Sequence, residues 1–168
     1  MNAHEFMASL AQGTPPQIYL LAGEEPYYIR RAEEAILRRL LPDAAARADA
    51  LIRYEEMPAI DALAESLETA PFFTDKIVVL VHDAAIFRAG KKAAEGDAPA
   101  PKDGAAERLL ALLTNLLPTT YVVFTLNAKP DKRRKLYQAV QKAGRILESE
   151  AVRPWNVEGW LNERLREM

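Results

Sequence analysis

The chain has 168 residues, of which 49% are hydrophobic and 27% charged, and a formal net charge of −2. This composition is typical of a globular protein with an apolar core, and the length suits one domain with the start of a second. A slightly acidic chain is not expected to bind nucleic acid strongly by itself, because such binding usually needs a basic surface. With no cysteine, the chain has no disulfide, thiolate nucleophile or cysteine metal site. No apolar stretch approaches the roughly 20 residues of a membrane-spanning helix, and residues 1–6 lack the basic and apolar regions of a signal peptide, so we expect a cytoplasmic protein.

The first half of the chain predicts three strands separated by two helices. An apolar run at 17–23 predicts a buried strand, and apolar residues three or four positions apart predict an amphipathic helix at 26–41. A second strand at 50–54 and a second helix at 58–67 follow. The β-branched run at 76–81 is too continuous for a sheet with one exposed face, so it predicts a central strand covered on both faces.

The second half begins with a stretch at 88–104 that is rich in Gly, Ala, Pro and charged residues, which predicts a surface loop. A helix at 109–116 and a strand at 121–126 come next. Asp131 is the predicted N-cap of a further helix, and Gly144 its predicted C-terminal stop.

A short strand at 145–148 and a terminal helix that carries Trp160 complete the pattern. Strands and helices thus alternate about five times, which indicates right-handed crossovers and an α/β domain of three layers with a mainly parallel five-stranded sheet. We expect this domain to cover 1–150. Residues 151–168 are the expected start of a second domain, since Trp155 and Trp160 need a surface to pack against.

The glycine at the end of the first strand invites comparison with a phosphate-binding loop. That loop needs glycines whose N–H groups face the phosphates, a lysine, and a hydroxyl for magnesium. Here Gly23 is followed by Glu24, Glu25 and Pro26, and no Gly-Lys-Ser/Thr sequence follows. Two carboxylates repel phosphate and proline lacks an N–H donor, so we expect a degenerate loop that binds no nucleotide, and no cofactor.

Other catalytic signals are weak. His82 and Asp83 follow a predicted strand where a related ATPase carries an Asp-Glu pair for magnesium, but Ala84 stands at the second position. Asn127 follows the next strand, at the place of a γ-phosphate sensor. Polar residues at strand ends more often satisfy backbone groups, and His4 and His82 alone do not make a metal site. We therefore predict no catalytic residue and no bound metal.

The densest positive patch in the sequence comprises four consecutive residues, Lys132, Arg133, Arg134 and Lys135. Cations in the first turns of a helix oppose its dipole, which favours an anionic partner such as the DNA backbone or an acidic protein. The alternative is a solvated helix start with no partner.

Two adjacent phenylalanines, Phe72 and Phe73, lie between a predicted helix and the strand at 76–81. Neighbouring side chains on a short turn do not point into the same core easily. Three alternatives remain open: the pair caps the core, one ring faces inward and the other outward, or both form an exposed hydrophobic plug.

Four segments, in register along nearly the whole chain, resemble the family of DNA polymerase III delta subunits. They are Ile18–Tyr27, Pro71–Lys76 with the strand that follows it, Asp131–Tyr137, and Trp155–Leu161. The resemblance implies the N-terminal AAA+-like (P-loop NTPase-type) domain of a clamp-loader subunit, with a degenerate nucleotide site and the first helix of a lid domain.

In that family the subunit has no catalytic activity of its own. It binds the ring-shaped sliding clamp (the beta subunit) and opens it, together with the ATPase gamma/tau and delta prime subunits, and meets primed DNA in the assembled complex. The resemblance places the family's exposed clamp-binding pair at Phe72 and Phe73, although leucine is commoner at the first position. The alternative is a nucleotide-dependent AAA+ or P-loop-like ATPase with an atypical phosphate loop.

Overall fold

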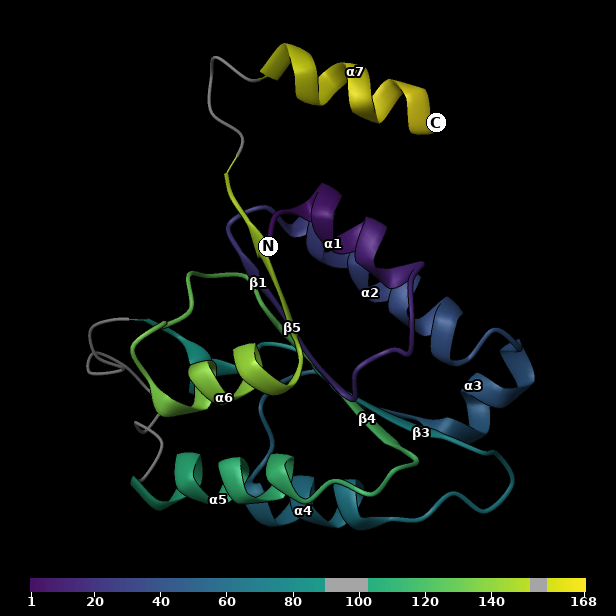
Figure 1. The fold of residues 1–168 in the computed structure, drawn as a ribbon, viewed down its shortest axis with the longest axis vertical. Coiled ribbons are helices and arrows are strands. Elements are labelled where there is room, and N and C mark those ends of the chain that lie inside the picture. Colours follow the sequence, from purple (N-terminus) through teal and green to yellow (C-terminus); the bar gives the residue numbers. More distant parts are fainter. Residues whose placement is uncertain (90–102, 152–156) are drawn as a thin grey trace.

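The computed structural model describes residues 1–89, 103–151 and 157–168, and at its centre is a parallel sheet of five strands in the order β2-β3-β4-β1-β5 (Figure 1). Every neighbouring pair runs parallel. The strands are β1 (Ile18–Gly23), β2 (Leu51–Tyr54), β3 (Ile77–Val81), β4 (Thr120–Leu126) and β5 (Arg145–Ser149). The predicted α/β architecture with a mainly parallel five-stranded sheet is confirmed.

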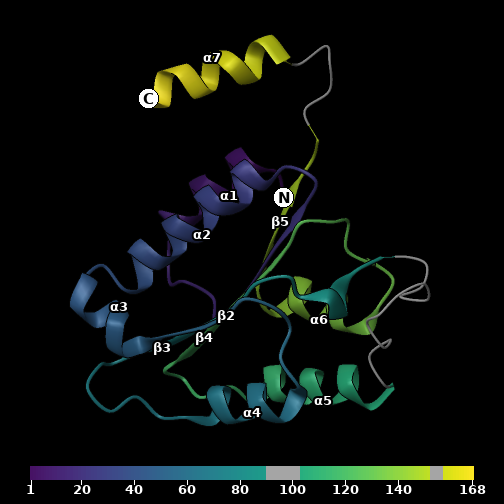
Figure 2. The ribbon, with the colours of Figure 1, turned by 180° about the vertical axis from the view of Figure 1, so that it is seen from behind.

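Helices cover both faces of the sheet (Figures 1 and 2). One face carries α1 (Ala3–Leu10), α2 (Pro26–Leu40) and α3 (Ala44–Ala50), and the other carries α4 (Ile60–Glu68), α5 (Asp103–Thr114) and α6 (Lys135–Ala143). A short 3₁₀ turn, η1 (Ala85–Phe87), follows β3, and α7 (Val157–Glu167) follows β5. Among the described residues, no helix is long and apolar enough to cross a membrane.

Successive residues of a strand point to opposite faces, so each inner strand contributes to two apolar clusters. In β1, Leu20 packs with α4, α5 and α6, whereas Tyr19 and Leu21 pack with α1 and α2. All residues of β3 are buried, as its β-branched run predicts, but β4 rather than β3 is the middle strand.

Two helices lack a clear signal in the sequence. α1 begins with a capping box in which the Asn2 side chain and Glu5 exchange hydrogen bonds with each other's backbone N–H. α3 has the sequence AAARADA, and its small alanine side chains do not form a recognisable apolar face. The Asp43 side chain caps its first turn.

The predicted start of α6 at Asp131 is wrong. The helix begins at Lys135 with Arg134 as its N-cap residue, and Gly144 ends it as predicted. The Asp131 carboxylate instead accepts the backbone N–H of Arg133, at 3.1 Å, so it closes a turn ahead of the helix. The loop predicted at 88–104 lies mostly outside the described residues, as does Trp155.

Because all five strands run in the same direction, the loops that follow strands lie at one end of the sheet and the loops that precede strands lie at the other. The carboxyl end carries the loops after β1, β4 and β5, at 23–25, 127–134 and 149–151. The amino end carries the loops before β3 and β4, at 69–76 and 115–119. Ligands of open α/β sheets bind at the carboxyl end, where strand order reverses.

Candidate functional site

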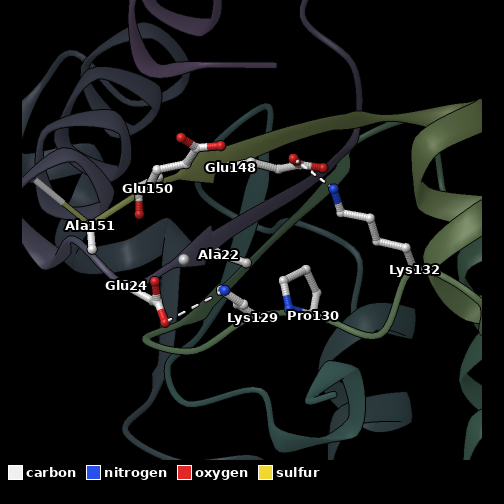
Figure 3. A pocket seen from close by; sticks show the side chains of 10 residues that line it. Ala22, Glu24, Lys129, Pro130, Lys132, Glu148, Glu150 and Ala151 are labelled. Atoms are coloured by element: carbon white, nitrogen blue, oxygen red, sulfur yellow. Dashed lines mark hydrogen bonds and ion pairs between the residues drawn. The ribbon is translucent and has the colours of Figure 1, made fainter. Parts of the chain in front are cut away.

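A pocket of about 330 Å³ lies at the carboxyl end of the sheet, between the loops after β1, β4 and β5 (Figure 3). Gly23 and Glu24 line it on the β1 side, Lys129 and Lys132 on the β4 side, and Glu148 on the β5 side. This is the place at which a P-loop ATPase of the same topology holds its nucleotide.

The loop after β1 is closed by its own residues. Glu25 caps α2 by accepting the backbone N–H of Tyr27 at 3.1 Å, and Pro26 occupies the first turn without a donor. The backbone N–H of Glu24 donates to the carbonyl of Ser149 at 2.9 Å. The amides that would cradle a phosphate are therefore engaged by a carboxylate and a carbonyl of the chain itself.

Gly23 shows how closely this loop packs against β5. Its φ is +142°, which side chains rarely tolerate, and a Cβ added there would lie 1.9 Å from the carbonyl oxygen of Ser149. The end of β1 therefore packs directly against the backbone of β5.

The charges that line the pocket also disfavour a phosphate. Lys132 Nζ lies 2.9 Å from Glu148 Oε2, and Lys129 Nζ lies 4.0 Å from Glu24 Oε1 (Figure 3). Burial alone raises the pKa of Glu148, but hydrogen bonds from Tyr137 and Lys132 outweigh it and hold that pKa below its usual value. Both lysines thus face carboxylates of the chain.

Two of the other nucleotide-related residues, His82 and Asp83, are engaged within the chain, whereas Asn127 is exposed after β4. His82 places Nε2 at 2.9 Å from Glu33 and Nδ1 at 3.1 Å from Glu55, which ties β3 to α2 and to the end of β2. Asp83 pairs with Arg88 at 2.9 Å. In the part of the chain that the structure describes, no group of three or more His, Cys, Asp or Glu residues could hold a metal ion.

The basic run lies mainly on the loop before α6, and three of its cations have partners. Lys132 pairs with Glu148, Arg133 pairs with Asp131, and Arg134 donates to the carbonyl of Ile86 at 2.9 Å. Since only Lys135 lies inside α6, the helix dipole disfavours one cation rather than four. Contact of Lys132, Arg133, Arg134 and Lys135 with DNA or an acidic partner stays a prediction.

The amino end of the sheet is different, because Phe72 and Phe73 are 89% and 82% exposed. Their rings stack edge to face with centroids 5.0 Å apart. The core-capping alternative is therefore wrong, and so is the alternative with one ring inward. Adjacent exposed rings of this size form an apolar patch, and such patches are typical of interaction sites, so a role for Phe72 and Phe73 in binding stays a prediction.

The turn that carries the pair, which we call the aromatic turn (residues 69–76), is anchored at both ends. At the α4 end, Thr69 Oγ1 donates to the carbonyl of Glu65 at 2.7 Å. At the β3 end, Thr74 Oγ1 donates to the carbonyl of Lys76 at 2.8 Å, and the Ile77 N–H donates to Thr119 at 2.9 Å. Two exposed rings are thus presented by a fixed scaffold.

Helix α7 contacts the start of α2 through polar side chains and through Trp160, whose ring lies edge to face with Tyr27 at a centroid distance of 6.5 Å. Tyr27 and Arg31 both bond to Glu167, and the Tyr28 hydroxyl donates to Glu163 at 3.0 Å. Burial, followed by this hydrogen bond, raises the pKa of Tyr28 to about 12, so the hydroxyl stays a donor at neutral pH. No residue of α7 is buried. The sequence signal for this contact is the pair of adjacent tyrosines at the start of α2.

The parallel sheet in the order β2-β3-β4-β1-β5, covered by helices on both faces, defines an AAA+-like α/β domain. Residues 19–150 match the family model of the DNA polymerase III delta subunit, which is well over half of the chain. The chain belongs to this family.

Solved structures agree on the fold. The Bacillus subtilis DNA clamp loader delta protein (YqeN) superposes with a TM-score of 0.71 and 22% identity, over 88% of this chain and 42% of that one. A DNA polymerase III gamma subunit-related protein from Thermotoga maritima gives a TM-score of 0.50 and 16% identity, over 88% and 45%. The chain thus spans less than half the length of either structure. No curated protein sequence matches it significantly.

Proposed function

We propose that this domain is the clamp-binding part of a clamp-loader delta subunit, which grips the sliding clamp (the beta subunit) and opens the ring or holds it open for loading onto DNA. The observation that carries the proposal is the exposed Phe72 and Phe73 pair on an anchored turn. Membership of the delta subunit family supports it. The fold also matches a structure described as a DNA clamp loader delta protein.

The aromatic pair is large enough to supply much of a binding energy. Full burial of one such side chain contributes about 1.5–3 kcal/mol, so two contribute about 3–6 kcal/mol. A micromolar complex needs about 8 kcal/mol, so the remainder must come from the surrounding surface.

We propose that the domain itself is not catalytic and does not bind ATP. The engaged amides of the first loop and the carboxylates around the pocket support this. Titration calorimetry with ATP and magnesium should show no low-micromolar site. A saturable site would favour the alternative, a nucleotide-dependent AAA+ or P-loop-like ATPase with an atypical phosphate loop.

Its proposed partners beside the clamp are the ATPase gamma/tau and delta prime subunits, with primed DNA bound only within the assembled complex in the cytoplasm. The domain boundary near residue 150 and the start of a second domain at α7 are part of the same proposal. Three exposed apolar residues of α7 support that boundary: Val157, Leu161 and Leu165.

The test is the double variant Phe72→Ala, Phe73→Ala, assayed against the cognate clamp. Binding should weaken by about a hundredfold or more, since each 1.4 kcal/mol is a factor of ten. The melting temperature should stay unchanged, because both rings are already exposed.

Leu165→Ala is the matched control, since it removes an exposed apolar side chain on α7, away from the aromatic turn. It should bind the clamp as wild type does. A folded Phe72, Phe73 variant with wild-type affinity would reject the assignment.

A further inference from the structure

A second apolar feature lies at the amino end of the sheet, in the groove between α4 and α5. It measures about 260 Å³, and its apolar lining includes Leu67, Leu112, Leu116 and Leu117. Drug-sized ligands occupy pockets of about 300–1,000 Å³, so this groove better suits one or two side chains of another protein.

The groove is continuous with the aromatic turn. Leu67 and Glu68 end α4, and the turn begins at the next residue, Thr69. The loop that carries Leu117 runs beside the end of the turn, where the Ile77 N–H bonds to the Thr119 carbonyl. A protein seated on the two phenylalanines therefore comes to lie beside the open groove.

The charges at this end indicate what the groove would accept. Arg108 on one rim pairs with Asp61. Glu68 on the other rim is exposed and, within residues 1–89, 103–151 and 157–168, has no ion-pair partner. Asp75 in the neighbouring turn is 90% exposed and has only a 3.4 Å pair with Lys76. The unpaired charge beside the groove is thus negative, and the groove itself is lined by leucines. A partner surface that complements both carries an apolar side chain next to a basic one.

We propose that the α4–α5 groove is a second contact for the sliding clamp and receives a protruding apolar side chain of the clamp that has a lysine or arginine beside it. This proposal rests on the proposed function. The contact would be reciprocal, since Phe72 and Phe73 insert into the clamp while the clamp inserts into the groove. One contact lets the ring pivot about the domain, whereas two fix its orientation.

Two variants test the groove and leave Phe72 and Phe73 in place. Ala111→Trp fills the groove from an exposed position on α5, and Glu68→Lys reverses the charge of its rim. Each should weaken binding to the purified clamp about tenfold. The melting temperature should not fall for Glu68→Lys, whose side chain is exposed, so this variant is informative even if the tryptophan disturbs packing.

Glu107→Lys and Gln141→Trp are matched controls, because both positions are exposed and lie outside the groove. They should bind as wild type does. Wild-type affinity in both groove variants, with a hundredfold loss in Phe72→Ala, Phe73→Ala, would overturn the groove and leave the proposed function standing. Wild-type affinity in all of these variants would overturn both.

Discussion

The two ends of the sheet differ in how their polar and apolar groups are satisfied. At the carboxyl end, Glu25 caps α2, Glu24 bonds to Ser149 through its backbone, and Lys132 pairs with Glu148. At the amino end, Phe72 and Phe73 face solvent, and their rings pack edge to face against each other. At the end that binds a ligand in related ATPases, several polar groups that line the pocket are paired within the chain. At the opposite end, two large apolar rings are exposed.

This difference indicates how an ATPase fold serves as a binding module. The loop after β1 has N–H groups that already donate to Glu25 and to the Ser149 carbonyl. It therefore needs no nucleotide to satisfy these donors. Aromatic rings that are more than 80% exposed lose little buried area when they are changed, so substitutions there affect binding more than folding. Substitutions at the carboxyl end should therefore change stability, whereas substitutions in the aromatic turn should change binding.

The largest expected effect on stability is that of Gly23→Ala at the carboxyl end. The new Cβ would meet the Ser149 carbonyl at 1.9 Å with φ at +142°, so both backbones must move. We expect a loss of roughly 3 kcal/mol, which lowers the melting temperature by about 6–12 °C in a domain of this size.

Gly13→Ala is the matched control for that substitution. Gly13 also has a positive φ, +66°, but nothing lies within 4 Å of an added Cβ. Thermal unfolding should show a loss of only about 1 kcal/mol. Equal losses in the two variants would mean that the loop after β1 is not packed against β5 as described.

The amides of helix α7 should be much less protected from hydrogen exchange than those of strand β3. It has no buried residue, whereas all of β3 is buried. Amide hydrogen exchange in 157–167 should be at least about tenfold faster than in 77–81, since local opening of an exposed helix costs little. Equal protection in the two segments would contradict the assignment of α7 to a second domain.

A smaller effect is expected for the pH dependence of stability. The pKa of Glu148 lies below its ordinary value of 4.5, because the bonds from Tyr137 and Lys132 outweigh the effect of burial. The interactions of ionised Glu148 therefore add to the free energy of unfolding above pH 4.5. This stabilisation is lost as the pH falls through the lower pKa that Glu148 has in the folded state.

Lys132→Gln should raise the pKa of Glu148. The free energy of unfolding should then fall less steeply as the pH is lowered below 4.5. Partly exposed ion pairs contribute about 0.2–1 kcal/mol, so the change is small. Lys135→Gln is the control, because Lys135 is exposed and makes no ion pair among the residues that the structure describes. Urea unfolding from pH 3 to 7 measures both variants, and identical acid limbs would contradict the role of Lys132.

Local features of the sequence were sufficient to predict the sheet and the closed loop. The residues of β3 predict a buried strand because the run is short, rich in β-branched residues and has no polar face for solvent. Glu24 and Glu25 predict a degenerate loop because phosphate binding depends on residues adjacent in the chain. These predictions needed no information about distant contacts.

The errors arise where distant contacts decide the outcome. Asp131 resembles a helix cap, but it closes a turn that also brings Arg134 onto the carbonyl of Ile86. The exposure of both phenylalanines depends on where the end of α4 sits over the sheet, which no local pattern encodes. The groove between α4 and α5 likewise exists only after the two helices pack.

The most direct test of the account is a hydrogen-exchange map of the domain with and without its clamp. Binding should slow exchange at the amino end, in 66–76 and 111–119, and leave the carboxyl-end loops at 23–28 and 127–134 unchanged. Protection confined to the carboxyl-end loops, with 66–76 unaffected, would contradict the claim that this domain binds the clamp through the aromatic turn.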